Sequence, residues 1–142
     1  MTKDKFRLNL RYEDEGEIIE EVMDINFSMH SIIRVSRVLD RIGNIPDIQR
    51  RIIFLLEQIP RFLLEEVKVG ETIAVFDWFT HSSFVLNMDN EKINVITLFD
   101  EANHAYGKSL KMFEGEKFVE FSANDIVYGV FTKYENRTIC DN

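Results

Sequence analysis

Four residues that can bind phosphate or transfer a proton fall close together in the stretch FSMHSIIRVSRVLDRI, residues 27–42. They are His30, Arg34, Arg37 and Arg41. If the stretch is a helix, a rotation of about 100° per residue places all four within an arc of about 60°. An arginine can bind phosphate oxygens in pairs, and a histidine can gain or lose a proton near neutral pH. The stripe is therefore a candidate phosphate-binding surface, and the alternative is an ordinary solvated helix face.

Three further candidates lie in segments that we expect to join strands. His81, in FTHSSF, falls at a strand end or turn. His104 and Lys108 fall in the longer segment 100–113, DEANHAYGKSLKMF. Loops held on a rigid sheet often carry functional side chains. We therefore expect this segment to be the best candidate for a functional loop. The three histidines do not have metal-ligand spacing, so we expect neither a metal nor another cofactor.

Two polar residues stand inside apolar strand segments. Thr97, in INVITLF, should share one strand face with Ile93, Val95 and Phe99. Asp77, in VFDWF, is flanked by aromatic residues and is a weak acid–base candidate. The alternatives are an ordinary strand threonine and a charge at the edge of a hairpin.

These residues would be positioned by an α+β fold. Alternation over residues 5–25 predicts an N-terminal β-hairpin. Two helices should follow, at about 29–42 and 47–66, the second with a kink or a restart at Pro60. Residues 71–134 should then form a four- to five-stranded antiparallel sheet. We expect one domain over 1–142, made of a hairpin (1–26), two helices (27–66) and the sheet.

The bulk composition limits the classes of protein that fit. The chain has 142 residues, a net charge of −8 and one cysteine, Cys140. No intramolecular disulfide can form, and no apolar run approaches the length of a membrane span. We therefore expect a cytoplasmic protein with no membrane contact. The acidic balance argues against an obligate nucleic-acid coat protein, because phosphate binding depends mainly on cations.

The order of the elements resembles a known family. The stretch FSMHSIIRVSRVLDRI, the second helix and the segments ETIAVFD and SSFVLNMDNEKINVITLFD are similar to the RelE/barnase-like (BECR-fold) small endoribonucleases, including RegB-like phage enzymes. His30 and Arg34 match the His-x-x-x-Arg helix of several such families, and the similarity covers roughly residues 27–122. The hairpin at residues 5–25 and the acidic charge depart from the family pattern.

The resemblance implies metal-independent cleavage of single-stranded RNA, in which the ribose 2′-OH attacks the adjacent phosphate. His30 would be one acid–base group, with His81 or His104 as the second, and Arg34 would stabilise the phosphorane. Thr97, which ends the Val-Ile-Thr run, joins the candidate catalytic residues. The candidate RNA-binding residues are Arg37, Arg41, His104 and Lys108.

Two other classes of function fit the same sequence. A non-enzymatic acidic protein, such as an immunity protein, an antitoxin-like factor or a phage inhibitor, would bind a basic protein partner. The charge of −8 and the acidic clusters at 13–21 and 114–120 favour that class. A structural subunit that self-assembles is the third alternative, and the twelve phenylalanines permit it.

Overall fold

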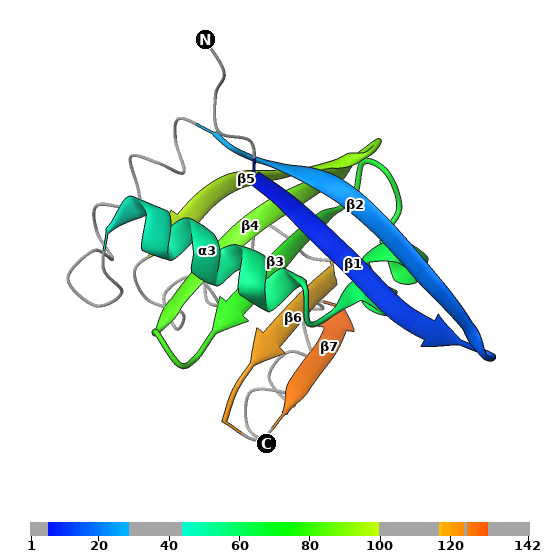
Figure 1. The fold of residues 1–142 in the computed structure, drawn as a ribbon. Coiled ribbons are helices and arrows are strands. Elements are labelled where there is room, and N and C mark those ends of the chain that lie inside the picture. Colours follow the sequence, from blue (N-terminus) through cyan, green and yellow to red (C-terminus); the bar gives the residue numbers. More distant parts are fainter. Residues whose placement is uncertain (1–5, 29–43, 100–116, 124, 131–142) are drawn as a thin grey trace, which may run out of the picture.

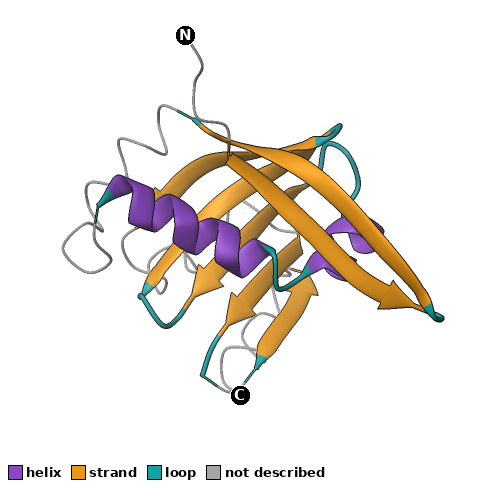
Figure 2. Ribbon diagram, viewed as in Figure 1, coloured by secondary structure: helices purple, strands orange, loops and turns teal. Residues whose placement is uncertain are grey.

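The computed structural model describes residues 6–28, 44–99, 117–123 and 125–130. Within them, seven strands form one mixed sheet in the order β1-β2-β5-β4-β3-β6-β7. The sheet curves as a half-barrel around one helix, α3 (Ile45–Leu56) (Figures 1 and 2). The predicted fold class, with two helices followed by a separate antiparallel sheet, is therefore wrong. The N-terminal hairpin is part of the main sheet, because β2 pairs with β5.

The strands occupy the segments that alternate or are richest in β-branched and aromatic residues. Their bounds are β1 (Phe6–Asp14), β2 (Glu17–Phe27), β3 (Thr72–Asp77), β4 (Ser82–Asp89), β5 (Lys92–Phe99), β6 (Lys117–Phe121) and β7 (Ile126–Val130).

Two of the six strand pairings are parallel, which corrects the predicted all-antiparallel sheet over 71–134. Asp24–Phe27 of β2 pair with Lys92–Val95 of β5. Ile73–Asp77 of β3 pair with Lys117–Phe121 of β6. Parallel neighbours need a long connection that returns the chain to the same end of the sheet. The long segments between β2 and β3 and between β5 and β6 give the chain that length.

A tight turn shapes the hairpin of β1 and β2. Glu15 and Gly16 both have positive φ angles, 50° and 83°. A two-residue turn of this kind matches the right-handed twist of the strands that it joins, and glycine adopts positive φ at little cost. The turn pairs Asp14 with Glu17 and sets the register of the whole hairpin.

The described helical structure is shorter than predicted. Asn44 caps α3 through a reciprocal pair of hydrogen bonds with Asp47. The helix ends at Leu56, and a single helical turn, η1 (Phe62–Glu66), follows Pro60. The structure thus has the restart at Pro60 rather than a continuous kinked helix. The predicted helix at 29–42 lies outside the described residues. No described helix has the length and apolar character needed to cross a membrane.

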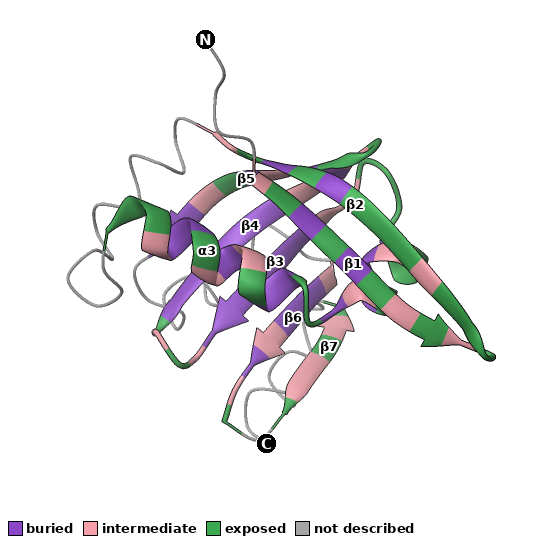
Figure 3. Ribbon diagram, in the orientation of Figure 1, coloured by how far each residue is buried: buried purple, intermediate pink, exposed green. Residues whose placement is uncertain are grey.

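The main core lies between the concave face of the sheet and the apolar side of α3 and η1 (Figure 3). Ile48, Ile52 and Leu55 of α3 are at most 2% exposed. Strands β3 and β4 are also buried on their other face, where Phe76 is 0% exposed. On that face the ring of Phe118 covers Gly129 of β7, where a Cβ atom would lie 2.4 Å from the ring.

Candidate functional site

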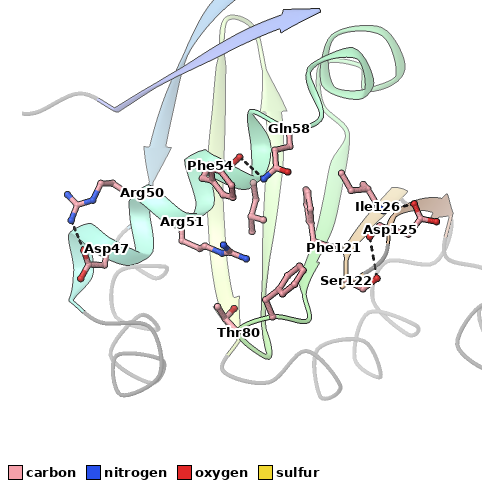
Figure 4. Close-up of a pocket in the computed structure, with 12 residues that line it drawn as sticks. Asp47, Arg50, Arg51, Phe54, Gln58, Thr80, Phe121, Ser122, Asp125 and Ile126 are labelled. Carbon is pink, nitrogen blue, oxygen red and sulfur yellow. Dashed lines mark hydrogen bonds and ion pairs between the residues drawn. The ribbon is translucent and has the colours of Figure 1, made fainter.

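A large cavity lies between α3, the β3–β4 loop and the β6–β7 turn (Figure 4). Its volume is about 1010 Å³. The apolar part of its wall consists of Phe54, Leu55, Phe79, Phe121 and Ile126. Among the described residues, the charged groups at the cavity are two acids and two bases: Asp47, Asp125, Arg50 and Arg51. The cavity is therefore mainly apolar, with no strong excess of either charge.

A buried ion pair stands beside this cavity. Arg51 donates from Nε and Nη2 to the two carboxylate oxygens of Asp77, at 3.0 and 3.1 Å. The Asp77 side chain is 2% exposed and that of Arg51 is 28% exposed. Thr80 Oγ1 and the Phe79 N–H also donate to Asp77, at 2.7 and 3.2 Å. Four hydrogen bonds thus fix a carboxylate at the end of β3, a satisfied arrangement for a buried charge.

Two exposed aromatic rings flank the guanidinium of Arg51. Its Cζ lies 5.6 Å from the ring centroid of Phe54 and 5.7 Å from that of Phe79. The rings remain 55% and 58% exposed. Arg51 points toward the cavity, whereas Arg50 points away from it and pairs with Asp47 at 2.6 Å (Figure 4). The cavity mouth is consequently an aromatic surface around an immobilised cation.

The described side chains here do not form an acid–base pair. The hydrogen bond from Arg50, helped by the backbone N–H of Asn44, holds the pKa of Asp47 below its usual value. Asp47 therefore stays ionised, and Asp77 is occupied by the four bonds described above. A general acid needs a proton that it can release at working pH. Nor do three or more His, Cys, Asp or Glu side chains of the described part cluster as metal ligands.

Six of the eight predicted site residues lie outside the described residues, so no distance tests their convergence. They are His30, Arg34, Arg37, Arg41, His104 and Lys108. The other two, His81 and Thr97, are placed by the structure. His81 is an exposed residue of the β3–β4 loop, with a φ of 52°. This agrees with the turn position predicted for it.

The face predicted for Thr97 is wrong. A β-bulge at Ile96 changes the register, because Val85 pairs with Thr97 while the next residue, Leu86, pairs with Val95. Thr97 therefore leaves the core-facing side occupied by Val95, and its buried hydroxyl has no hydrogen-bond partner among the described residues. An extra residue reverses the alternation of every side chain beyond it. Ser28 Oγ donates to the bulged Ile96 carbonyl at 2.8 Å.

The second notable surface is the acidic hairpin, residues 6–28. It carries seven carboxylates and two arginines, a net charge of −5, against −8 for the whole chain. Asp24 pairs with Arg7 at 3.6 Å and Asp14 with Arg61 at 3.5 Å. The remaining five form no ion pair with any described residue: Glu13, Glu15, Glu17, Glu20 and Glu21. The hairpin therefore concentrates uncompensated negative charge.

Side chains from the end of α3 and from η1 hold the outer edge of β1. Glu57 Oε2 accepts from the Asn9 N–H at 2.7 Å, and Arg61 Nη2 donates to the Glu13 carbonyl at 2.7 Å. Tyr12 donates to Glu65 at 2.6 Å. This hydrogen bond is the main cause that raises the pKa of Tyr12, and burial is a smaller one. The contacts occupy backbone groups that an edge strand would otherwise expose.

A second cavity of about 530 Å³ runs along the opposite edge of the hairpin. The charged residues of the described part that line it are four carboxylates and one arginine: Glu21, Asp24, Asp89, Glu91 and Arg7. Apolar side chains of η1 and of the segment after it also line the cavity, among them Leu64, Val67 and Val69. This cavity, unlike the first, is acidic.

Arg51 was not among the predicted site residues, although its position on the helix gives a signal in the sequence. At about 100° per residue, Arg51 falls about 60° from Ile48 and about 40° from Leu55, on the apolar side of the helix. A cation on an apolar face requires a buried acceptor. Asp77, flanked by Phe76 and Trp78, is a carboxylate in an equally apolar strand. Matching these two exceptions would have suggested the ion pair.

Comparisons of the chain with protein-family models, with curated proteins and with solved structures found no match.

Proposed function

We propose that this chain is a non-enzymatic acidic protein that binds a basic protein partner through the β1–β2 hairpin. The observation that carries the proposal is the concentration of charge. A net −5 lies on residues 6–28, and five of the seven carboxylates there have no ion-pair partner among the described residues. Charge of one sign on one surface increases the rate of encounter with an opposite charge and excludes partners of like charge.

The cavity beside α3 supports the non-enzymatic part of the proposal. Its ion pair, Arg51 with Asp77, is fully hydrogen-bonded, and Asp47 is held ionised by Arg50. These charges hold the β3–β4 loop to α3 and do not provide a group poised to exchange protons. Immunity proteins, antitoxins and inhibitors that act by occupying a basic surface need no such group.

The test begins by capturing partners from an extract of the cells that make the protein, using the full chain, and then purifying the main partner. Its Kd is measured at increasing salt for three forms of the chain. The hairpin variant carries Glu17→Gln, Glu20→Gln and Glu21→Gln. The matched control carries Asp47→Asn, Glu66→Gln and Asp125→Asn, which remove the same charge elsewhere.

We expect a partner with net positive charge, a Kd that weakens with salt, and about tenfold weaker binding by the hairpin variant only. Equal losses in both variants, or a Kd that does not change with salt, would overturn the proposal. Cleavage of single-stranded RNA in EDTA by the wild-type chain, lost in His30→Ala, would also overturn it in favour of a ribonuclease.

A further inference from the structure

Among the residues that the structure describes, no strand pairs with the edge of β2 that faces away from β1 along Glu17–Met23. In the described residues, β2 pairs with β5 only from Asp24 to Phe27, and no described strand lies beside the preceding seven residues. The tip of the hairpin extends away from the other strands (Figure 1). Edge strands of this length are usually covered, charged or shortened, because they can pair with another chain.

The register identifies which backbone groups point outward. Asn9 of β1 lies opposite Val22, and the Asn9 N–H donates away from β2, to Glu57. Opposed residues in an antiparallel ladder either bond each other or both point outward, so the Val22 N–H and C=O point away from β1. By the two-residue period, those of Ile18 and Glu20 do the same. On the same edge, the Asp24 N–H already bonds the Glu91 carbonyl, at 3.3 Å.

The surroundings of this edge select the chemistry of an incoming strand. The acidic cavity of about 530 Å³ lies along it, with Leu64, Val67 and Val69 in its apolar wall. Ile18 and Val22, two large aliphatic side chains of this charged hairpin, are 56% and 59% exposed. A strand beside them would place alternate side chains against aliphatic groups and among carboxylates.

We infer that Ile18, Glu20 and Val22 form a strand-addition site for an extended basic segment of a protein partner. The inference rests on the proposed function and specifies how the basic partner is bound. The segment would lie beside Glu17–Met23 of β2. It would be in line with β5, ahead of the first residue of β5, Lys92. Its backbone would exchange hydrogen bonds with the three outward residues, and its lysine or arginine side chains would reach the carboxylates of the hairpin and the acidic cavity.

The probe is a fluorescein-labelled ten-residue peptide that alternates lysine with threonine or valine, and its matched control has glutamate in place of lysine. Binding to the full chain is measured by fluorescence anisotropy. Val22→Pro removes the outward N–H without removing a bond to β1. Val22→Thr keeps that N–H and a side chain of similar shape.

We expect the lysine peptide to bind at least about tenfold tighter than the glutamate peptide, and Val22→Pro to weaken it by about tenfold. Val22→Thr should stay within about twofold of the wild type. On adding the lysine peptide, hydrogen exchange should slow at the amides of Ile18, Glu20 and Val22, and not at Ile19 and Glu21. Unchanged binding by Val22→Pro, equal losses in both variants, no binding of the lysine peptide, or protection elsewhere would each overturn strand addition.

Val22→Pro and the triple glutamine variant of the hairpin together separate this inference from the proposed function. If Val22→Pro binds the purified basic partner as the wild type does, while the triple glutamine variant binds weakly, strand addition is wrong and the acidic-surface proposal stands. If the triple glutamine variant also binds normally, the proposed function itself is wrong.

Discussion

The two edges of the N-terminal hairpin contrast sharply. Along β1, outward backbone groups are covered by side chains, since Asn9 donates to Glu57 and the Glu13 carbonyl accepts from Arg61. Along β2, the groups before Asp24 have no such cover among the described residues. Specific hydrogen bonds therefore block pairing at one edge of the hairpin, whereas the described residues leave the other edge available for it.

The largest loss of stability should come from breaking the buried ion pair between Arg51 and Asp77. Arg51→Met leaves the Asp77 carboxylate buried without its cation, so we expect the free energy of unfolding to fall by about 3–5 kcal/mol. Arg50→Met, in the adjacent exposed pair with Asp47, is the matched control and should cost at most about 1 kcal/mol. Urea denaturation measures both, and equal losses would show that burial of the pair does not matter.

Proline at neighbouring positions of β2 tests the two edges directly. Glu21→Pro removes an N–H that bonds β1, and should lower the free energy of unfolding by about 3 kcal/mol. Val22→Pro removes an outward N–H and should cost about 1 kcal/mol. The pair is compared by urea denaturation. A larger loss for Val22→Pro than for Glu21→Pro would mean that the edge assignment is reversed.

Removing the cover from β1 should make its edge resemble that of β2. Arg61→Ala deletes the donor to the Glu13 carbonyl, the pair with Asp14 and the contact over the Tyr12 ring, whose centroid is 4.7 Å away. We expect a loss of about 1–2 kcal/mol in thermal denaturation and a new tendency to dimerise in light scattering. A variant as monomeric and as stable as the wild type would contradict the protective role of Arg61.

The acceptor at Asn9 should make a smaller contribution. Glu57→Ala leaves the Asn9 N–H without an acceptor and should cost about 1 kcal/mol. Glu57→Gln keeps an acceptor oxygen at the same position and should recover most of that loss. Thermal denaturation of the two variants decides between them. Equal losses would point to the charge of Glu57 rather than to its cover of the edge.

The smallest loss of stability should come from alkaline pH, which breaks the hydrogen bond from Tyr12 of β1 to Glu65. The hydrogen bond to Glu65 raises the pKa of Tyr12 above its usual value of 10.0. The folded state therefore holds this proton more tightly, and the stabilisation is complete below pH 10 and is lost as pH rises through the folded pKa. Tyr12→Phe should flatten this part of the stability profile above pH 10. An unchanged profile would show that the hydrogen bond from Tyr12 to Glu65 does not stabilise the edge of β1.

Local patterns located the strands but not their partners. Period-two alternation marks Phe6, Leu8 and Leu10 as one face of β1, and the last two are fully buried. The pairing of Asp24 with Lys92 joins residues far apart in sequence, and its energy comes from packing that a local window does not contain. The hairpin therefore looked like an appendage to an α+β fold, although it forms one side of the sheet.

The same difference between local patterns and long-range contacts decides which features of the candidate sites could be predicted. Arg51 and Asp77 each conflict with their apolar surroundings, a signal that the sequence contains. The bulge at Ile96, which moves Thr97 to the other face, has no glycine or proline to mark it, since the run is Val95-Ile96-Thr97. Among the described residues, the edge of β2 is open because β5 does not extend beside residues 17–23. This is a property of the assembled sheet, and the sequence of residues 17–23 does not contain it.

Hydrogen exchange in the free protein compares the two edges of the hairpin in one experiment. The amides of Ile18, Glu20 and Val22 should exchange much faster than those of Ile19 and Glu21, which bond β1, and faster than that of Asn9, which bonds Glu57. If the three outward amides are instead protected as strongly as Ile19 and Glu21, the edge is already covered, and no strand can be added there.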